Sequence, residues 1–167
     1  MIIRVSDLDE RGLTVDDRTA LAFADPAWRL ESVVLRVEPD GREVFVQGRV
    51  RAAVPQTCGR CAETFVTPVD VDVDVRLVPR PAVADDVELG ADDLEVDFYE
   101  GDLLDLSRVV ETETTLALPM KPLCRPDCHG LCPVCGANRN LSPCACGAPS
   151  TDPRLAPLRD LAVRLPR

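Results

Sequence analysis

The feature that most constrains this chain is the spacing of its eight cysteines. Six of them lie between residues 124 and 146, and the other two form a Cys-x2-Cys pair in the first half of the chain. A buried free cysteine needs no regular interval from its neighbours, whereas two cysteines two residues apart can place both sulfurs on one ion. The pattern therefore predicts zinc sites, with the ligands Cys58, Cys61, Cys124, Cys128, Cys132, Cys135, Cys144 and Cys146.

Two groupings of these eight thiols are compatible with the spacing. In the grouping that we favour, a Cys-Pro-Val-Cys-Gly knuckle shares an ion with the Cys-x-Cys pair that follows it, and the remaining two tail cysteines join the early pair. The sites are then Cys132, Cys135, Cys144 and Cys146, and Cys58, Cys61, Cys124 and Cys128. In the alternative, Cys124, Cys128, Cys132 and Cys135 share one ion. The favoured grouping predicts two structural zinc ions and a clamp between the end of a sheet and the end of a helix.

Charge is divided unevenly along the 167 residues. Residues 1–120 carry 12 basic and 26 acidic groups, a net charge of −14, and residues 121–167 carry 7 basic and 3 acidic groups, a net charge of +4. Because phosphate contacts supply most non-specific affinity for nucleic acid, the acidic body is a poor general binder, and any RNA contact has to be local. The chain shows no basic leader, and no stretch approaches the roughly 20 apolar residues that span a bilayer. We expect a cytoplasmic protein without membrane contact.

The first 120 residues are dominated by strand patterns. Residues 32–37 and 43–51 are rich in β-branched side chains and flank Pro39-Asp40-Gly41, which predicts a hairpin. Valines alternate with aspartates from residue 69 to 75, so one face of this strand is expected to be buried and the other to face solvent. The Cys58–Cys61 pair lies between two such strands and is therefore expected at a turn. We also expect strands at residues 2–5 and 96–99, a core position for Trp28, and a mobile acidic loop over residues 79–97.

The second half of the chain predicts helices around the cysteines. A helix is expected from Asp102, as its N-cap, to Leu118, because Pro119 ends it. A last helix is expected near Pro157. The fold class is therefore α+β: a twisted antiparallel sheet with a packed helix over residues 1–120, followed by a cysteine-rich zinc module with a terminal helix over residues 121–167.

Other features of the chain bear on alternative functions. His129 is the only histidine, which argues against hydrolases that need an imidazole base, and we expect it to be an exposed turn residue rather than a metal ligand. The Cys58–Cys61 pair is an alternative redox motif, with Arg60 lowering a thiol pKa, but thioredoxin-like motifs begin a helix. The acidic loop is an alternative adaptor surface for a protein partner. The basic residues Arg42, Arg49, Arg51 and Arg60 either form a strip or pair with nearby carboxylates.

The order of these features resembles the YceD-like family, which is named for large ribosomal RNA subunit accumulation. The resemblance is carried by Cys58-Gly59-Arg60-Cys61 after a valine-rich strand, by residues 102–119, by Cys128-His129-Gly130-Leu131-Cys132-Pro133-Val134-Cys135-Gly136-Ala137-Asn138, and by residues 152–158. Arg139, where a leucine is usual before Asn140, and Pro157 depart from the family pattern.

This resemblance implies a bacterial cytoplasmic factor needed for normal amounts of large-subunit (23S) ribosomal RNA, acting in large-subunit assembly. It implies no catalytic activity and no small-molecule substrate. The implied partners are large-subunit rRNA or a ribosomal protein. From the residues alone, the chain is expected to be a non-enzymatic module stabilised by zinc.

Overall fold

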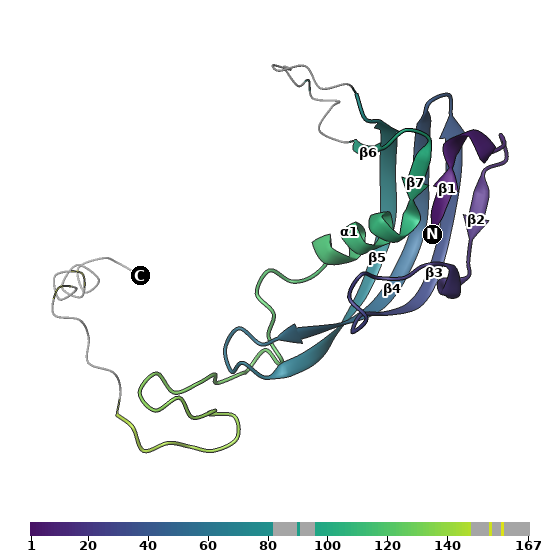
Figure 1. The fold of residues 1–167 in the computed structure, drawn as a ribbon. Coiled ribbons are helices and arrows are strands. Elements are labelled where there is room, and N and C mark those ends of the chain that lie inside the picture. The colour runs from purple at the N-terminus through teal and green to yellow at the C-terminus, as the bar shows by residue number, and fades with distance from the viewer. Residues whose placement is uncertain (82–89, 91–95, 148–153, 155–157, 159–167) are drawn as a thin grey trace, which may run out of the picture. The chain divides into compact units, whose positions relative to one another are not determined.

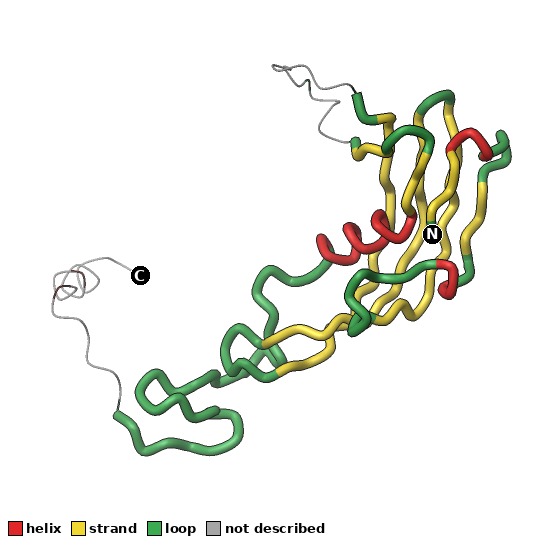
Figure 2. Tube along the Cα trace, viewed as in Figure 1, coloured by secondary structure: helices red, strands yellow, loops and turns green. Residues whose placement is uncertain are grey.

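The structure is a computed structural model that describes residues 1–81, 90, 96–147, 154 and 158. The chain divides into two compact units. Unit 1 comprises residues 1–56 and 64–122, and unit 2 comprises residues 57–63 and 123–167. Unit 1 holds the α-helix and all the named strands, except for Thr57, which ends a strand and belongs to unit 2. Residues 123–147 of unit 2 are loops and turns (Figures 1 and 2).

Unit 1 is built on three long neighbouring strands, β3 (Arg29–Asp40), β4 (Glu43–Thr57) and β5 (Thr64–Pro79). The β3–β4 hairpin confirms the prediction, and Gly41 takes a φ of 62° in its turn, which a residue without Cβ adopts readily. The expected parity also holds, since Val44, Val46 and Val50 are fully buried. In β5, Val73 is buried and the aspartates are exposed. The alternation of apolar and charged side chains thus gives one buried and one wet face.

Short strands complete this sheet at both edges, in the order β2-β3-β4-β5-β6. β2 (Leu13–Val15) pairs antiparallel with β3, whereas β6 (Asp97–Tyr99) pairs parallel with β5. The expected antiparallel sheet is therefore present, and β6 is a parallel addition that the sequence did not indicate. Residues 6–25, which the sequence indicated only as a polar lead-in, contain β2 and the short 3-10 helix Arg18–Ala20. A second 3-10 helix, Val5–Asp7, overlaps the start of this segment.

A second, two-stranded sheet pairs β1 (Ile2–Arg4) with β7 (Leu103–Asp105) in antiparallel register. The α-helix α1 (Leu106–Leu116) follows β7 directly, so the expected helix start at Asp102 was wrong. Asp105 is the N-cap, because its carboxylate accepts a hydrogen bond from the Ser107 amide at 3.0 Å. Asp102 instead accepts hydrogen bonds from the backbone amide and the hydroxyl of Ser6, which hold β1 against β7.

The core of unit 1 lies between the valine face of the large sheet, α1 and the β1–β7 pair (Figure 1). Leu35, Val37, Leu104 and Leu106 are among its fully buried side chains, and Thr114 is buried with its hydroxyl donating to the Val110 carbonyl at 2.7 Å. A smaller cluster forms around Ala52, Val54 and Val69. Trp28 is partly buried and packs against this cluster, edge-on to Phe23. It therefore lies at the edge of the core, whereas a core position was expected.

The wet face of the sheet is covered by paired charges. Arg49 and Arg51 both contact Asp70, at 2.6 and 3.2 Å, and Arg76 contacts Glu43 at 2.7 Å. For Arg49 and Arg51 the second of the two sequence expectations, pairing with carboxylates, is therefore met. Most of the acidic loop of residues 79–97 and the helix expected near Pro157 lie outside the described residues. No helix in the described ranges combines the length and apolar character of a membrane span.

Candidate metal centre

Two knuckles of the same backbone geometry position four of the eight cysteines. In the first knuckle, the Cys58 amide donates to the Glu63 carbonyl at 2.9 Å and the Ala62 amide donates to the Cys58 carbonyl at 3.0 Å. The second repeats this pattern, from the Cys132 amide to Ala137 at 2.8 Å and from the Gly136 amide to Cys132 at 2.9 Å. The fourth residue after each leading cysteine has positive φ, 60° at Ala62 and 73° at Gly136. Each turn therefore positions two cysteine side chains so that both sulfurs can bind one ion.

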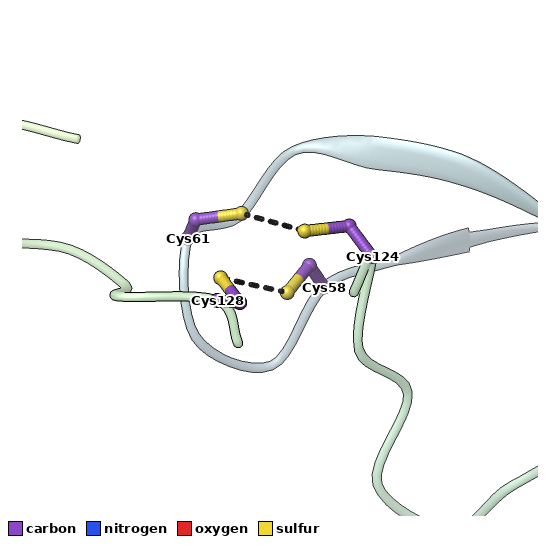
Figure 3. A group of neighbouring side chains, drawn as sticks. All are labelled: Cys58, Cys61, Cys124 and Cys128. Carbon is purple, nitrogen blue, oxygen red and sulfur yellow. Dashed lines mark hydrogen bonds between the residues drawn. The ribbon is translucent and has the colours of Figure 1, made fainter. Parts of the chain in front are cut away.

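The first knuckle meets the segment that follows α1 and brings four thiols together (Figure 3). This group, called the first tetrad, consists of Cys58, Cys61, Cys124 and Cys128. Its Sγ atoms all lie within 4.8 Å of one another, with 3.8 Å between Cys58 and Cys128 and 3.6 Å between Cys61 and Cys124. Three of the four side chains are buried and Cys124 is half-buried.

The second knuckle meets the Cys-x-Cys pair and forms the second tetrad, Cys132, Cys135, Cys144 and Cys146. Its Sγ atoms also lie within 4.8 Å of one another. Here only Cys132 is buried, and Cys135 and Cys146 are exposed. The structure therefore assembles the thiols in the grouping favoured from the sequence, and it separates Cys124 and Cys128 from the knuckle at Cys132.

The donor set of both tetrads fits a tetrahedral divalent ion. Zinc–sulfur bonds of about 2.3 Å in tetrahedral geometry place the sulfurs about 3.8 Å apart. The 3.6 and 3.8 Å contacts of the first tetrad match that separation and are far longer than a disulfide bond of about 2.05 Å. All eight cysteines are free. Four thiolates leave no open position for water at such an ion, which is the arrangement of structural rather than catalytic zinc.

Backbone N–H groups lower the pKa of some of these thiols, whereas burial raises the pKa of others. Backbone N–H groups of Cys124 and Cys61 lower the pKa of Cys58 to about 6, and those of Cys135 and Val134 lower the pKa of Cys132 to about 6. Burial, together with the neighbouring thiols, raises the pKa of Cys124 to about 12. The Cys135 thiol and burial raise the pKa of Cys146 to about 12. Without a cation, four thiolates cannot share so small a space, whereas a divalent ion favours the deprotonated form of each.

A small hairpin joins the two tetrads within unit 2. Leu131 and Asn138 form an antiparallel bridge, and the Arg139 amide donates to the Gly130 carbonyl at 2.9 Å, so that the second knuckle is the turn of this hairpin. On its other edge, the Leu131 amide donates to the Arg60 carbonyl of the first knuckle at 2.9 Å. Gly130 lies at this contact with a φ of 71°, and a Cβ there would stand 2.9 Å from the Arg60 carbonyl oxygen.

This close approach yields a prediction for Gly130→Ala. The variant is expected to lose about 2 kcal/mol of unfolding free energy, because the added methyl combines left-handed strain with a backbone clash. The matched control is Gly136→Ala, which has a similar φ of 73° but open space around its Cβ. That variant is expected to lose about 1 kcal/mol from strain alone. Denaturant unfolding of both proteins measures the difference, and equal losses would contradict the close contact at Arg60.

The remaining sequence candidates have other surroundings. His129 is exposed, as expected, and belongs to neither tetrad. The Arg60 guanidinium donates to the Cys128 carbonyl at 2.9 Å, so it binds a carbonyl group and not a carboxylate. The Cys58–Cys61 pair lies in a turn between β4 and β5 instead of beginning a helix, and each of its sulfurs faces a sulfur of the tail segment. Sequence reasoning missed Asn140, whose Nδ2 lies 3.3 Å from Cys128 Sγ, and Asn138, which donates to the Glu63 side chain beside the first knuckle.

Comparison with known proteins identifies similar chains. The family model described as "Large ribosomal RNA subunit accumulation protein YceD" matches residues 46–162. Uncharacterised proteins of Mycobacterium tuberculosis and Mycobacterium bovis are each 37% identical over 103 residues, which is 61% of this chain and 48% of theirs. An uncharacterised protein of Mycobacterium leprae is 33% identical over 129 residues, 76% of this chain and 57% of its own.

The chain thus spans about half the length of the curated relatives it matches. No solved structure matches it. The matched residues 46–162 include both knuckles and all eight cysteines.

Proposed function

Since this chain belongs to the YceD family of large ribosomal RNA subunit accumulation proteins, we propose that it is a non-enzymatic factor that supports accumulation of 23S rRNA and assembly of the large ribosomal subunit. The family description names accumulation of an RNA and no reaction. The structural observation that supports a scaffolding role is the pair of closed four-cysteine groups, which offer no open position for a substrate. The factor would act in the bacterial cytoplasm, where ribosomes are assembled.

Structural zinc is part of this proposal. Cys58, Cys61, Cys124 and Cys128 would hold one ion, and Cys132, Cys135, Cys144 and Cys146 the other. Bound zinc would supply cross-links between segments that have no other regular structure, since residues 123–147 contain no helix or strand element. Structural zinc contributes on the order of 10 kcal/mol in small metal-binding peptides. The ion would therefore define the conformation of unit 2.

The partner in this proposal is large-subunit rRNA or a ribosomal protein. The net charge of −14 over residues 1–120 disfavours broad electrostatic binding of RNA by that part of the chain. The arginines described on the wet face of the sheet are held by carboxylates at 2.6 to 3.2 Å. A contact with RNA would therefore be made by residues 121–167, which carry a net charge of +4 before metal-bound thiolates are counted.

Depletion of this protein in its host tests the function. We expect 23S rRNA to fall relative to 16S rRNA, together with a deficit of large subunits in sucrose gradients. Complementation with the unaltered chain should restore the ratio. A variant with serine at both Cys58 and Cys61 should fail to restore it, because the first tetrad is lost. An unchanged 23S to 16S ratio in depleted cells would contradict the proposed function, whatever the metal content of the purified protein.

A further inference from the structure

The side chain of Asn140 reaches from the loop of the second tetrad to a sulfur of the first. In sequence it lies between Cys135 and Cys144, which belong to the second tetrad. In the structure its amide nitrogen Nδ2 lies 3.3 Å from Cys128 Sγ in the first tetrad. The contact is therefore a direct hydrogen bond from the polypeptide loop of one candidate metal site to a ligand of the other.

The orientation of the Asn140 amide is fixed by its other partners. Oδ1 accepts a hydrogen bond from the His129 backbone amide at 2.8 Å, and Nδ2 also donates to Asn138 Oδ1 at 2.9 Å. Because a backbone N–H can only donate, the oxygen of the Asn140 amide has to face His129, which leaves the NH2 group facing the sulfur. One of its two N–H groups serves Asn138 and the other serves Cys128.

The loop that carries Asn140 contains no helix or strand element, and its internal hydrogen bonds converge on Asn138. Leu141 and Ser142 donate to the Asn138 carbonyl at 3.1 and 3.2 Å, and the Asn140 backbone amide donates to Asn138 Oδ1 at 3.0 Å. The loop begins after Cys135 and ends at Cys144, and both cysteines belong to the second tetrad. An ion in the second tetrad would therefore close the loop and hold Asn140 at its position near Cys128.

We propose that Asn140 is a positioning residue for the Cys128 thiolate, and that through it metal loading of the second tetrad strengthens metal binding by the first. This inference rests on the proposed structural zinc and adds that binding at the second tetrad supports binding at the first. A hydrogen bond to a coordinating sulfur stabilises its thiolate form, and loss of such an outer partner typically costs about 10- to 100-fold in metal affinity. The exposed second tetrad would act as a support for the buried first one.

The test uses three variants of the full chain. Asn140→Asp keeps the Oδ1 acceptor for His129 but replaces the donor to Cys128 by an anionic oxygen. Gln47→Glu is the control, since it makes the same amide-to-carboxylate change at an exposed position of β4, where Nε2 donates to Asp74 and not to a sulfur. Cys144→Ser breaks the second tetrad and leaves every ligand of the first intact. Zinc affinity of the first tetrad is measured by competition with a chromogenic chelator.

Cadmium-substituted protein supplies a readout that a purely structural role would not move. Cadmium NMR gives one resonance for each four-sulfur site, and its chemical shift responds to hydrogen bonds at the sulfurs. We expect Asn140→Asp to shift the resonance of the first tetrad and to weaken its zinc binding about 10- to 100-fold. Gln47→Glu is expected to leave the resonance unshifted and the zinc affinity of the first tetrad unchanged within a few-fold.

The double variant decides the coupling. Cys144→Ser alone is expected to weaken the first tetrad by a similar factor, and Asn140→Asp combined with Cys144→Ser is expected to weaken it no further, because both remove the same contact. Independent, multiplicative losses in the double variant would overturn the coupling, as would an unchanged first-tetrad affinity in either single variant. If the unaltered chain binds no metal at all, the structural zinc and this inference fall together. If it binds two ions that load independently, only this inference fails.

Discussion

Replacing Cys61 by serine is expected to release one of two zinc ions and to destabilise the protein around the β4–β5 turn. Cys61 is buried, and its Sγ lies 3.6 Å from that of Cys124. Cys58 and Cys61 are three positions apart, whereas Cys124 lies 63 positions beyond Cys61, after β5, β6, β7 and α1, so this tetrad closes a long loop of the chain. Structural zinc is worth on the order of 10 kcal/mol in small peptides, which is comparable with the whole stability of a domain.

Hydrogen exchange and zinc content measure this effect. We expect faster exchange in Cys61→Ser at residues 50–57 and 64–70, which are the strand ends continuous with the turn, as well as in residues 123–131. The matched control is Cys146→Ser, which removes an exposed ligand of the second tetrad. With zinc in excess, its exchange changes are expected to stay within residues 129–147. If both variants alter only the C-terminal segment, the first tetrad does not clamp the sheet.

Gly48→Ala is expected to have the largest effect of any change in unit 1 that adds a single methyl group. Gly48 pairs with Leu35 in the β3–β4 ladder and has a φ of 152°, a region that is almost confined to glycine. A Cβ there would lie 2.0 Å from the Val34 carbonyl oxygen and 2.9 Å from Leu35 Cα. Both obstacles are backbone atoms, so no side chain can move aside. The expected loss is on the order of 3 kcal/mol or more.

Denaturant unfolding of Gly48→Ala against Gly41→Ala checks this result. Gly41 also has positive φ, 62°, but nothing lies within 4 Å of its Cβ position. Gly41→Ala is therefore expected to lose only about 1 kcal/mol from strain. A loss of similar size in the two variants would mean that β3 and β4 can separate at Gly48 at little cost, contrary to the ladder.

The parts of the fold that the sequence predicted correctly depend on local signals. The β3–β4 hairpin follows from two β-branched runs around Asp40-Gly41, and the alternation from Val69 to Val75 marks the buried face of β5. Spacing also favoured, over one alternative, the cysteine grouping that the structure shows, because two cysteines two residues apart at a tight turn can bind the same ion. In each case the residues that carry the signal are close in sequence.

The errors arose where distant pairing decides the structure. Residues 103–105 have helical periodicity with the segment after them, yet they form β7 because β1 pairs with them from the other end of the chain. That pairing moves the N-cap of α1 from Asp102 to Asp105. The parallel register of β6 on β5 is likewise non-local. β2 is only three residues long and lies in polar surroundings, so its alternation is too short to detect.

The hydrogen bond from Asn140 to Cys128 was inaccessible to sequence reasoning for a similar reason. Spacing assigns the loop between Cys135 and Cys144 to one tetrad, whereas the miniature hairpin at Leu131 and Asn138 folds that loop back toward the other. Metal-ligand spacing can predict which sulfurs share an ion. It does not indicate which side chains support those sulfurs from outside the ligand set.

We propose that the eight thiolates hold two ions in closed, all-sulfur sites. Metal analysis of protein purified without added zinc, combined with X-ray absorption at the zinc edge, is the decisive experiment. We expect close to two zinc ions per chain, each with four sulfur neighbours at about 2.3 Å. Protein that contains no metal and keeps its fold in the presence of a strong chelator would contradict it, and so would zinc bound mainly through nitrogen or oxygen.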